Sequence, residues 1–384
     1  MHPPFRHAPT PSDRLPTQVD VAIVGGGLSG LSAAIRLATE GVRVAVVESR
    51  IACGRGSGGR DPGVLTGGLP EHPWRLIHSI GAERTAEIYA ISQRNREIIA
   101  RFVELGPPPL HLAIDAREVD EIAKSAVALQ GIGLKVTELD APTATDRSAG
   151  RAFTAGMHVQ GESSVDVEAL CVAMVARLRQ LGGHVCTDQR VTSLDRPGDT
   201  HRVHTAEGAI VADAVVLCAG WALKALDPWF SDKLLPVREH SLRYDHAPDN
   251  LTCGRAQYGY ITWRRDELGG LVISGCRWAT QHLEMGETEE VPLDSVLEKI
   301  RSFVASHLPV EDSNISHSWA RILTATCDGL PILGPMPGDP TLLSCTGFQG
   351  FAPALALAAG EGVAQGLLTG EHGLPEWMSP RRFL

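Results

Sequence analysis

The chain has 384 residues, of which 43% are hydrophobic and 21% are charged, and its formal net charge at pH 7 is −10. This hydrophobic content excludes wholesale disorder, and the length is typical of two domains. The acidic balance argues against a nucleic-acid-binding surface, and no apolar run approaches the ~18 residues that a transmembrane helix needs.

The first 18 residues are rich in Pro, His and polar residues and lack the apolar core of a signal peptide, so we expect a flexible N-terminal arm. The eight cysteines are scattered along the chain without a CxxC pair. This pattern favours free thiols in a reducing compartment, and hence a cytoplasmic protein. The cysteines and histidines together predict no metal site.

Residues 19–50 carry the first motif. Apolar runs at 19–24 and 42–47 predict two buried strands, with a glycine turn and a helix at 31–40 between them. In the turn, Gly25 allows the tight bend, Gly27 allows a pyrophosphate to approach the backbone, and Gly30 allows the helix to pack closely on the sheet. Glu48 follows the second strand and can accept hydrogen bonds from a ribose. The pattern predicts a dinucleotide site that takes FAD or NAD rather than NADP.

A second glycine-rich segment at 53–63 helps to choose between these cofactors. It reads CGRGSGGRDPG, which is too rich in glycine for an ordinary helix or strand. Such a segment is typical of backbone wrapped around a ligand, and its place just after the ribose acid fits a long cofactor. It therefore favours FAD over NAD.

The rest of the chain continues this organisation. Helices are predicted at 77–105, 166–181, 293–308 and 353–368, with a mixture of short strands and loops at 110–155. A strand at 184–187 and a hairpin at 202–217 return to the first sheet. Alternating strands at 241–244, 258–263 and 271–274 predict an antiparallel sheet in a separate domain, and 318–325 predicts a strand that leads back.

Several stretches resemble the motifs of one family. They are ADAVVLCAGW at 212–221, TCDGLPILGP at 326–335, GFQGF at 347–351 and SPRRF at 379–383, besides the two glycine-rich segments. Through them the chain resembles the D-amino acid oxidase superfamily of FAD-dependent amine oxidoreductases. Its nearest group there contains glycine oxidase, sarcosine oxidase and γ-glutamylputrescine oxidoreductase. The motifs span nearly the whole chain but are not specific for a substrate.

The resemblance implies an α/β fold with a glutathione-reductase-type FAD-binding Rossmann domain (19–105, 156–233 and 318–384) and an antiparallel-sheet α+β substrate-binding domain (106–155 and 234–317). It implies non-covalent FAD, because Arg321 stands where the sarcosine oxidase group has its flavin-linking cysteine. The helix at 353–368 would direct its N-terminal amides toward the flavin. The residues implied at the cofactor are Gly25, Gly27, Leu28, Ser29, Gly30, Glu48, Ser49, Arg50, Ser57, Gly58, Gly59, Arg60, Val191, Ala219, Gly220, Gly347, Phe348, Gly350 and Phe351.

The substrate anchor departs from the family pattern. In glycine oxidase-like proteins an arginine before the T-x-D-G motif pairs with the substrate carboxylate, and Leu323 stands there in this chain. Arg321 faces the same side of the predicted strand and is the first candidate for the anchor, a surface arginine being the alternative. Arg277 is the second candidate. Tyr258 and Tyr260 share one face of their predicted strand and either line the cavity, with residues 60–65, or form a packed aromatic pair.

The resemblance implies oxidation of the C–N bond of an amine or amino acid by hydride transfer to flavin N5. The imine then hydrolyses, and O2 reoxidises the flavin to give H2O2. Because Ile273 is the nearest match to a lysine that promotes oxygen reactivity in the sarcosine oxidase group, two alternatives stay open. They are a dehydrogenase with a non-oxygen acceptor and a flavin-binding subunit of a larger complex. We expect small-molecule partners, with no nucleic acid and no membrane span.

Overall fold

The structure is a computed structural model of the chain and describes residues 5–9, 11–371 and 373–384. Its contacts divide the chain into two compact units. We call residues 6–60, 167–237 and 323–384 the parallel-sheet unit, and residues 61–166 and 238–322 the antiparallel-sheet unit. The domain limits predicted from the sequence differ from these units mainly at 61–105, which the prediction assigns to the FAD-binding domain.

The parallel-sheet unit contains strands in the order β17-β18-β11-β1-β2-β8, and β10 and β9 extend it from β11. The strands are β1 (Gln18–Val24), β2 (Val44–Val47), β8 (His184–Cys186), β9 (Val191–Asp195), β10 (His201–Thr205), β11 (Gly208–Leu217), β17 (Ile332–Met336) and β18 (Asp339–Thr346). β1 lies parallel to both neighbours, and Val24 is in register with Leu217 and Val47. The apolar runs that form these strands are buried, as expected for the centre of a parallel sheet.

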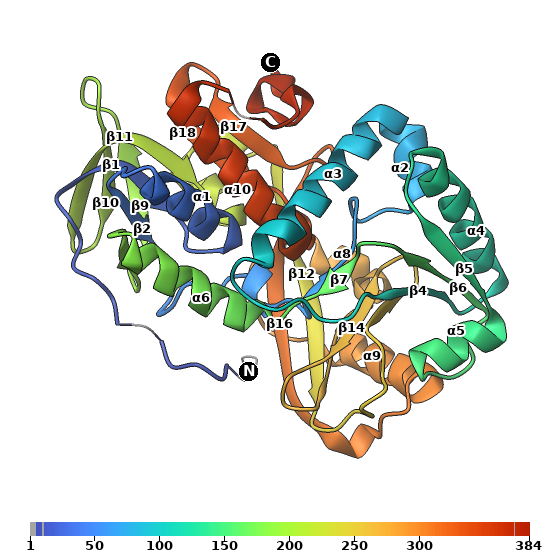
Figure 1. The fold of residues 1–384 in the computed structure, drawn as a ribbon. Coiled ribbons are helices and arrows are strands. Elements are labelled where there is room, and N and C mark those ends of the chain that lie inside the picture. Colours follow the sequence, from blue (N-terminus) through green and yellow to red (C-terminus); the bar gives the residue numbers. More distant parts are fainter. Residues whose placement is uncertain (1–4, 10, 372) are drawn as a thin grey trace. The chain divides into compact units, whose positions relative to one another are not determined.

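Among the described residues, this unit contains the long helices α1 (Leu28–Thr39), α6 (Val167–Gln180) and α10 (Ala352–Thr369). Figure 1 shows α1 beside α10. The two helices approach closely because Gly360 has no side chain, since a Cβ there would lie 2.3 Å from the Ser29 carbonyl oxygen. The glycine turn at the start of α1 is therefore held between the sheet and a neighbouring helix.

Residues 11–18 are tied to the edge of this sheet, which corrects the flexible arm predicted for 1–18. The Asp13 carboxylate accepts the Val185 N–H at 2.7 Å, and the Asp13 N–H donates to the Val185 carbonyl at 2.9 Å. Ser12 Oγ accepts the Thr187 N–H at 2.9 Å. These bonds fasten the segment beside β8, where unpaired strand groups would otherwise remain. Residues 1–4 and 10 lie outside the described residues.

The antiparallel-sheet unit contains a sheet in the order β16-β12-β15-β14-β13-β4-β6-β5. Its strands are β4 (Leu110–Ala113), β5 (Val136–Asp140), β6 (Ala155–Val159), β12 (Leu234–Tyr244), β13 (Gly254–Ala256), β14 (Ile261–Arg265), β15 (Leu271–Gly275) and β16 (Ile315–Thr326), and unit boundaries fall within β12 and β16. A short separate pair joins β3 (Val64–Leu65) to β7 (Ser163–Ser164).

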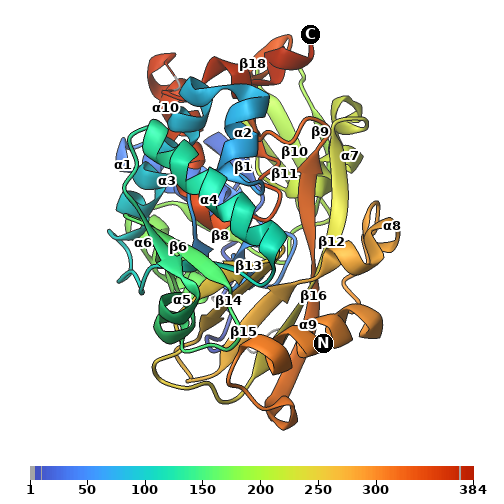
Figure 2. The same ribbon diagram turned by 90° about the vertical axis from the view of Figure 1, so that its right-hand side faces the viewer.

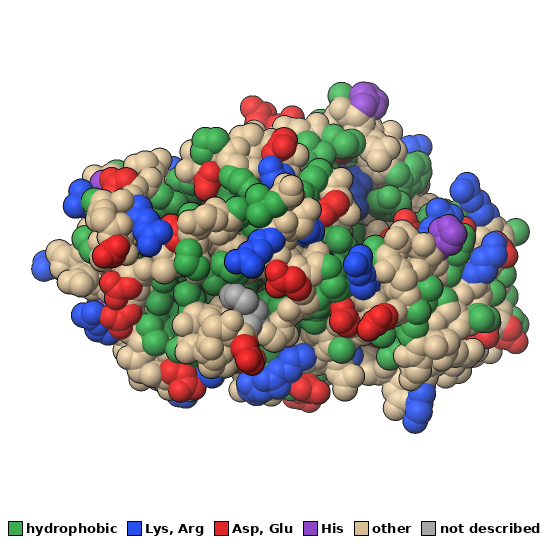
Figure 3. Space-filling view, turned by 90° about the horizontal axis from the view of Figure 1, so that it is seen from above, with side chains coloured by type: hydrophobic (Ala, Val, Ile, Leu, Met, Phe, Trp, Pro, Cys, Tyr) green, Lys and Arg blue, Asp and Glu red, His purple; other side chains and the backbone are tan. Residues whose placement is uncertain are grey.

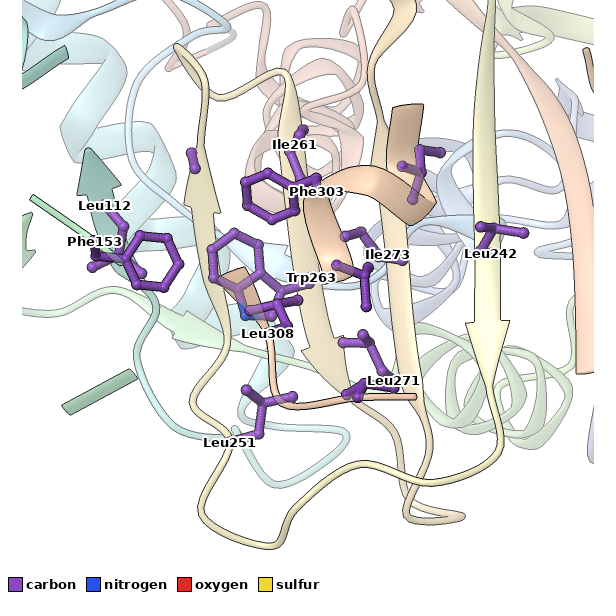
Figure 4. Packing of buried hydrophobic residues seen from close by; sticks show 14 of the residues in the cluster. Leu112, Phe153, Leu242, Leu251, Ile261, Trp263, Leu271, Ile273, Phe303 and Leu308 are labelled. Carbon is purple, nitrogen blue, oxygen red and sulfur yellow. The ribbon is translucent and has the colours of Figure 1, made fainter. Parts of the chain in front are cut away.

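One face of this second sheet packs against α9 (Asp294–His307). Trp263 and Ile273 are fully buried there, and the centres of the Trp263 and Phe303 rings lie 5.6 Å apart (Figure 4). Because side chains alternate along a strand, the neighbouring Thr262 and Arg264 point to the opposite face. Around Trp263 the sheet therefore has one apolar face for the core and a more polar opposite face.

Four helices of this unit depart from the predicted pattern: α2 (Pro73–Ile80), α3 (Ala82–Ile99), α4 (Ala116–Gly131) and α5 (Ala141–Ser148). The single helix predicted at 77–105 is α2 followed by α3, because Gly81 has a φ of +91° and breaks it. α4 falls in the predicted strand-and-loop region, and its start is capped by Asp115, which accepts the Glu118 N–H at 2.8 Å. Figure 2 shows α2 and α4 side by side.

On the face drawn in Figure 3, acidic and basic side chains are interspersed, without the block of basic side chains that typically binds nucleic acid. Within the described residues, none of the helices combines the length and the apolar character needed to cross a bilayer.

Candidate functional site

The glycine turn of the parallel-sheet unit joins β1 to α1. Gly25 has a φ of +107°, and a Cβ there would lie 2.7 Å from the Cys218 carbonyl oxygen, so only glycine fits. A Cβ on Gly30 would lie 2.0 Å from the Gly25 carbonyl oxygen. Gly27 is different, because no atom lies within 4 Å of a Cβ built there. The turn is therefore open at the N-terminus of α1, where backbone N–H groups and the helix dipole favour a phosphate.

Glu48 stands beside this turn, directly after β2, and is 8% exposed. Its two carboxylate oxygens accept the Gly26 N–H at 2.7 Å and the Arg50 N–H at 2.8 Å. Burial raises the pKa of the carboxyl, while these backbone hydrogen bonds oppose that shift. The acid is thus in the position that the dinucleotide motif assigns to ribose recognition.

The second glycine-rich segment folds back onto the first. The Gly54 N–H donates to the Gly26 carbonyl at 2.9 Å. A Cβ on Gly59 would lie 1.6 Å from the Gly54 carbonyl oxygen, so the loop closes tightly only with glycine at 59. Gly56, like Gly27, faces open space. The loop ends in one turn of 3-10 helix, Gly58–Arg60, and the Arg60 Nε donates to the Gly56 carbonyl at 3.3 Å.

The other residues predicted at the cofactor lie in the same unit, at the ends of its strands and helices. Leu28 and Ser29 begin α1, Ser49 and Arg50 follow β2, Val191 begins β9, and Ala219 and Gly220 follow β11; Ser57 and Gly58 belong to the loop above, and Gly347, Phe348, Gly350 and Phe351 to the turn before α10. In that last turn, the Gln349 N–H donates to the Thr324 carbonyl at 3.0 Å. Their contacts with a cofactor stay a prediction.

Arg321, the first predicted substrate anchor, lies in the antiparallel-sheet unit and is 2% exposed. Its Nη1 donates to Asp61 at 2.6 Å, and its Nε donates to Glu239 at 2.9 Å, with Nη2 paired to the same Glu239 oxygen. Both sides of the guanidinium therefore already bind carboxylates. A substrate carboxylate would have to displace one of them, so the geometry favours a positioning role, and direct substrate binding by Arg321 stays a prediction.

Glu239 connects the two predicted anchors, because its other oxygen accepts Arg277 Nη1 at 2.9 Å. Burial opposes the charge on Glu239, but Arg321 and Arg277 outweigh it and lower the pKa of this carboxyl. Burial also opposes the charge on Arg321, and Asp61 and Glu239 together raise its pKa. We call Asp61, Arg321, Glu239 and Arg277 the ion-pair cluster. Its most exposed arginine is Arg277, whose side chain is 21% exposed against 3% for Arg321.

The two predicted tyrosines do not share a strand face, which corrects the prediction of a strand at 258–263. β14 begins at Ile261, and residues 257–260 form a turn with φ values of +50° at Gln257 and +62° at Tyr258. The Tyr260 ring centre lies 4.9 Å from the Arg277 guanidinium, a cation–π contact. The Tyr258 ring instead packs edge to face against the His72 ring, with the two ring centres 5.0 Å apart. The turn therefore links the ion-pair cluster with a second group of polar residues.

That second group lines a pocket within the antiparallel-sheet unit, and the sequence reasoning missed most of it. Tyr258 shares the pocket with His72 before α2, His111 on β4, Glu118 on α4 and Arg255 on β13. These residues are far apart in the sequence and carry no motif spacing. Glu239 was missed for the same reason, whereas Asp61 lies in the segment 60–65 that was predicted to line the cavity but was not singled out.

The parallel-sheet unit is thus a Rossmann-type dinucleotide-binding unit, and its residues fit FAD. Open space above Gly27 and Gly56 leaves room for a ligand at the backbone, and the buried Glu48 stands at the ribose position. When bound, FAD supplies a two-electron acceptor in its isoalloxazine ring.

The chain belongs to the DAO family of FAD-dependent oxidoreductases, whose model matches residues 20–366, so the predicted family and cofactor are confirmed. It is 29% identical to a glycine oxidase of Pseudomonas aeruginosa, a match that covers 88% of this chain and 92% of that protein. Among solved structures, it resembles an L-proline dehydrogenase from P. horikoshii (18% identity, TM-score 0.80, covering 96% of this chain and 98% of that one). It also resembles a glycine oxidase from Geobacillus kaustophilus (22% identity, TM-score 0.74, 93% and 96%). These structures confirm the predicted α/β fold.

Proposed function

We propose that this FAD-dependent oxidoreductase oxidises the C–N bond of a small amine or amino acid to an imine, which water then hydrolyses. The observation that carries the proposal is the likeness to glycine oxidase over nearly the full length of both proteins. In this reaction the C–H hydrogen would leave carbon as a hydride, which is one proton with two electrons, and the amine nitrogen would lose a second proton. Bound FAD would supply the acceptor for the two electrons.

The chain's own part is to hold a neutral amine in position and to keep water from the reacting carbon. Arg277 is the better placed of the two predicted arginines for a contact with substrate. It is fixed by Glu239 and by the Tyr260 ring, yet part of its side chain is exposed. Arg321 then acts through Glu239, since it holds that carboxylate in place.

We propose O2 as the acceptor that returns the flavin to its oxidised state, with H2O2 as product. A dehydrogenase is the second candidate, and one observation favours it. The three lysines of the antiparallel-sheet unit, Lys124, Lys135 and Lys299, are all exposed, so none is a buried cation of the kind expected to promote oxygen reactivity.

One experiment tests both parts of the proposal. The purified yellow protein is mixed with a panel of amines and amino acids in air, and imine-derived carbonyl and H2O2 are measured together. Equal amounts of carbonyl and H2O2 support an oxidase. Carbonyl formed only when an artificial electron acceptor is added supports the dehydrogenase. Flavin-loaded protein that yields carbonyl from none of the amines under either condition contradicts the proposal.

A further inference from the structure

We infer that Trp278 determines the substrate preference of the enzyme, because it forms an apolar wall beside Arg277 on which the side chain of an amino acid packs. The inference rests on the proposed function, in which Arg277 contacts the substrate. It narrows the substrate class to amino acids with an apolar side chain, in place of glycine. Trp278 lies in none of the motifs through which the chain resembles its family. Every residue of the argument belongs to the antiparallel-sheet unit.

Trp278 and Arg277 are consecutive residues of one short 3-10 helix, and their side chains reach the same turn. The Trp278 Nε1 donates to the Gln257 Oε1 at 3.1 Å, at the start of the turn. The Arg277 guanidinium lies over the ring of Tyr260, the last residue of the turn. A hydrogen bond of 2.9 Å from the Tyr260 N–H to the Gln257 carbonyl closes this turn. The indole and the guanidinium therefore meet the two ends of one turn.

The backbone around these side chains has a conformation that residues other than glycine rarely adopt. Gln257 and Tyr258 have φ values of +50° and +62°, and Cys276 has a φ of +58°. Such residues cost free energy, persist only where surrounding contacts enforce them, and are typical of functional sites. One enforcing contact is the Cys276 N–H, which donates to the Tyr260 carbonyl at 3.0 Å. The strained residues thus flank the side chains of the proposed site.

The segment that carries Trp278 is also fixed further along. Glu284 is fully buried. Its carboxylate accepts the Thr280 hydroxyl at 2.9 Å and the Arg238 Nε at 2.8 Å. It also bonds to the His240 Nε2 at 3.0 Å. Trp278 therefore lies on an anchored segment, and the fold itself holds its indole at the surface.

The site offers an apolar surface next to polar groups that are not in use. Trp278 is 46% exposed. Glu239 engages only Nη1 of Arg277, so the Arg277 Nε and Nη2 have no hydrogen-bond partner among the described residues, and neither has the Tyr260 hydroxyl. A carboxylate matches these free donors of the guanidinium.

Two other kinds of substrate match this site less well. A polyamine would bring a cation to the Arg277 guanidinium, which repels it, and the nearby Glu239 carboxylate is already bound by two arginines. Glycine has no side chain that could cover the Trp278 indole, so it would gain nothing from the apolar surface. The arrangement therefore favours an amino acid with an apolar side chain.

Packing on Trp278 can be measured without turnover. The probes are 4-methylpentanoate and acetate, which carry no amine, titrated calorimetrically into the flavin-loaded protein. We expect 4-methylpentanoate to bind at least about tenfold more tightly, because its additional carbon atoms leave water on the indole. Trp278→Ala should remove most of this difference and change acetate binding by less than about threefold, whereas Trp278→Phe should keep part of it. Equal affinity of the two probes for the unaltered protein, or binding of neither, would overturn the inference.

Leu268→Ala is the matched control for the loss of an exposed apolar side chain. Leu268 is 57% exposed and belongs to the same β14–β15 hairpin, but it lies in the loop at the end of the hairpin opposite to the pair Ile261 and Gly275. This variant should bind both probes like the unaltered protein. An equal loss of 4-methylpentanoate binding in Leu268→Ala and Trp278→Ala would contradict the assignment.

The link to the substrate needs a separate measurement. Turnover of leucine, as each enantiomer, is compared with that of glycine. We expect one enantiomer of leucine to exceed glycine in kcat/KM by about tenfold or more, and Trp278→Ala to lower its value by about tenfold, with less than about threefold change for glycine and normal flavin content. Equal losses for both substrates, or a preference for glycine, would overturn the inference. Probe binding that depends on Trp278, without oxidation of any amine, would preserve the apolar wall and refute the proposed function instead.

Discussion

The two compact units build their expected ligand sites from different parts of the polypeptide. In the parallel-sheet unit the ligand site is built from backbone: glycines at 25, 30 and 59 close the turns, and Gly27 leaves space at the N-terminus of α1. In the antiparallel-sheet unit it is built from charged side chains, which are buried in pairs. Arg321 lies between Asp61 and Glu239, and Glu239 continues to Arg277.

This difference separates the cofactor site, which the protein shares with its family, from the substrate site, which is particular to it. A cofactor shared by a whole family is recognised by backbone geometry, which tolerates changes of side chain as long as the glycines remain. A substrate is selected by a few polar groups held at fixed positions by partners. We therefore expect substitutions in the two units to fail in different ways: loss of FAD in the first, and loss of stability or substrate discrimination in the second.

The largest effect should come from Gly27→Leu. Its side chain would fill the space where no atom lies within 4 Å of a Cβ, at the expected pyrophosphate position. The variant should fold but be purified without flavin, which visible absorbance and thermal melting together would show. Gly131→Leu is the matched control, because Gly131 also faces open space but ends α4, far along the chain from the glycine turn. Normal flavin content in Gly27→Leu would refute this cofactor position.

Arg321→Ala tests whether the ion-pair cluster is structural. Removal of the guanidinium leaves the Asp61 and Glu239 carboxylates, each with its side chain 9% exposed, without this cation, so unfolding should become easier by about 3 kcal/mol or more. Denaturant titration measures this change. Arg265→Ala should change stability by less than about 1 kcal/mol, because its partner Asp249 is exposed. Unchanged stability of Arg321→Ala, together with a selective loss of carboxylate substrates, would instead support Arg321 as the direct anchor.

Glu239→Gln should give a smaller and more selective effect. The amide keeps the shape of the side chain but removes the charge that fixes Arg277 and Arg321. Arg277 then becomes mobile, so KM for the best substrate should rise by about tenfold while flavin content stays normal. Steady-state kinetics with the identified substrate measures it. A fall in flavin content with unchanged KM would argue against a substrate-side role for this carboxylate.

The effect with the least consequence at neutral pH is a pH dependence due to His72. Its folded-state pKa of about 4 lies below the ordinary value of 6.5, so the unfolded chain binds a proton more readily in between. Stability from the neutral ring is complete above pH 6.5 and is lost as the pH falls toward 4. The loss should approach about 3 kcal/mol near pH 4. The melting temperature of both proteins is measured between pH 6.5 and pH 4. It should fall less in His72→Phe than in the unaltered protein, and an equal fall in both would show that His72 is not responsible.

The elements around the glycine turn could be predicted because their signals are local. Strand, turn, helix and acid follow one another within 19–50, and each residue's task depends on its immediate neighbours. α4 was missed because its sequence carries acids on its buried side. Glu118 and Glu121 are 2% and 5% exposed, and their burial is explained only by the groups that they bind in the folded chain. Glu118 accepts a hydrogen bond from Ile114, and Glu121 pairs with Arg75.

The substrate-side residues show the same limit more strongly. Arg321 was found through a family position, but its partners Asp61 and Glu239 are 260 and 82 residues away in the chain. No spacing rule connects residues that meet only in the folded chain. Tyr258 was placed on a strand because aromatic residues alternate there, whereas the positive φ values at 257 and 258 put it in a turn. Its neighbour His72 carries no motif at all.

The central claim is that flavin in this protein accepts electrons from a C–N bond, and anaerobic bleaching tests it most directly. The flavin-loaded protein is mixed without oxygen with primary amines, secondary amines, amino acids and, for comparison, the matching 2-hydroxy acids and alcohols. The account predicts that at least one amine or amino acid removes the visible flavin absorbance, and that its hydroxy counterpart does not. Bleaching by hydroxy compounds alone would contradict it.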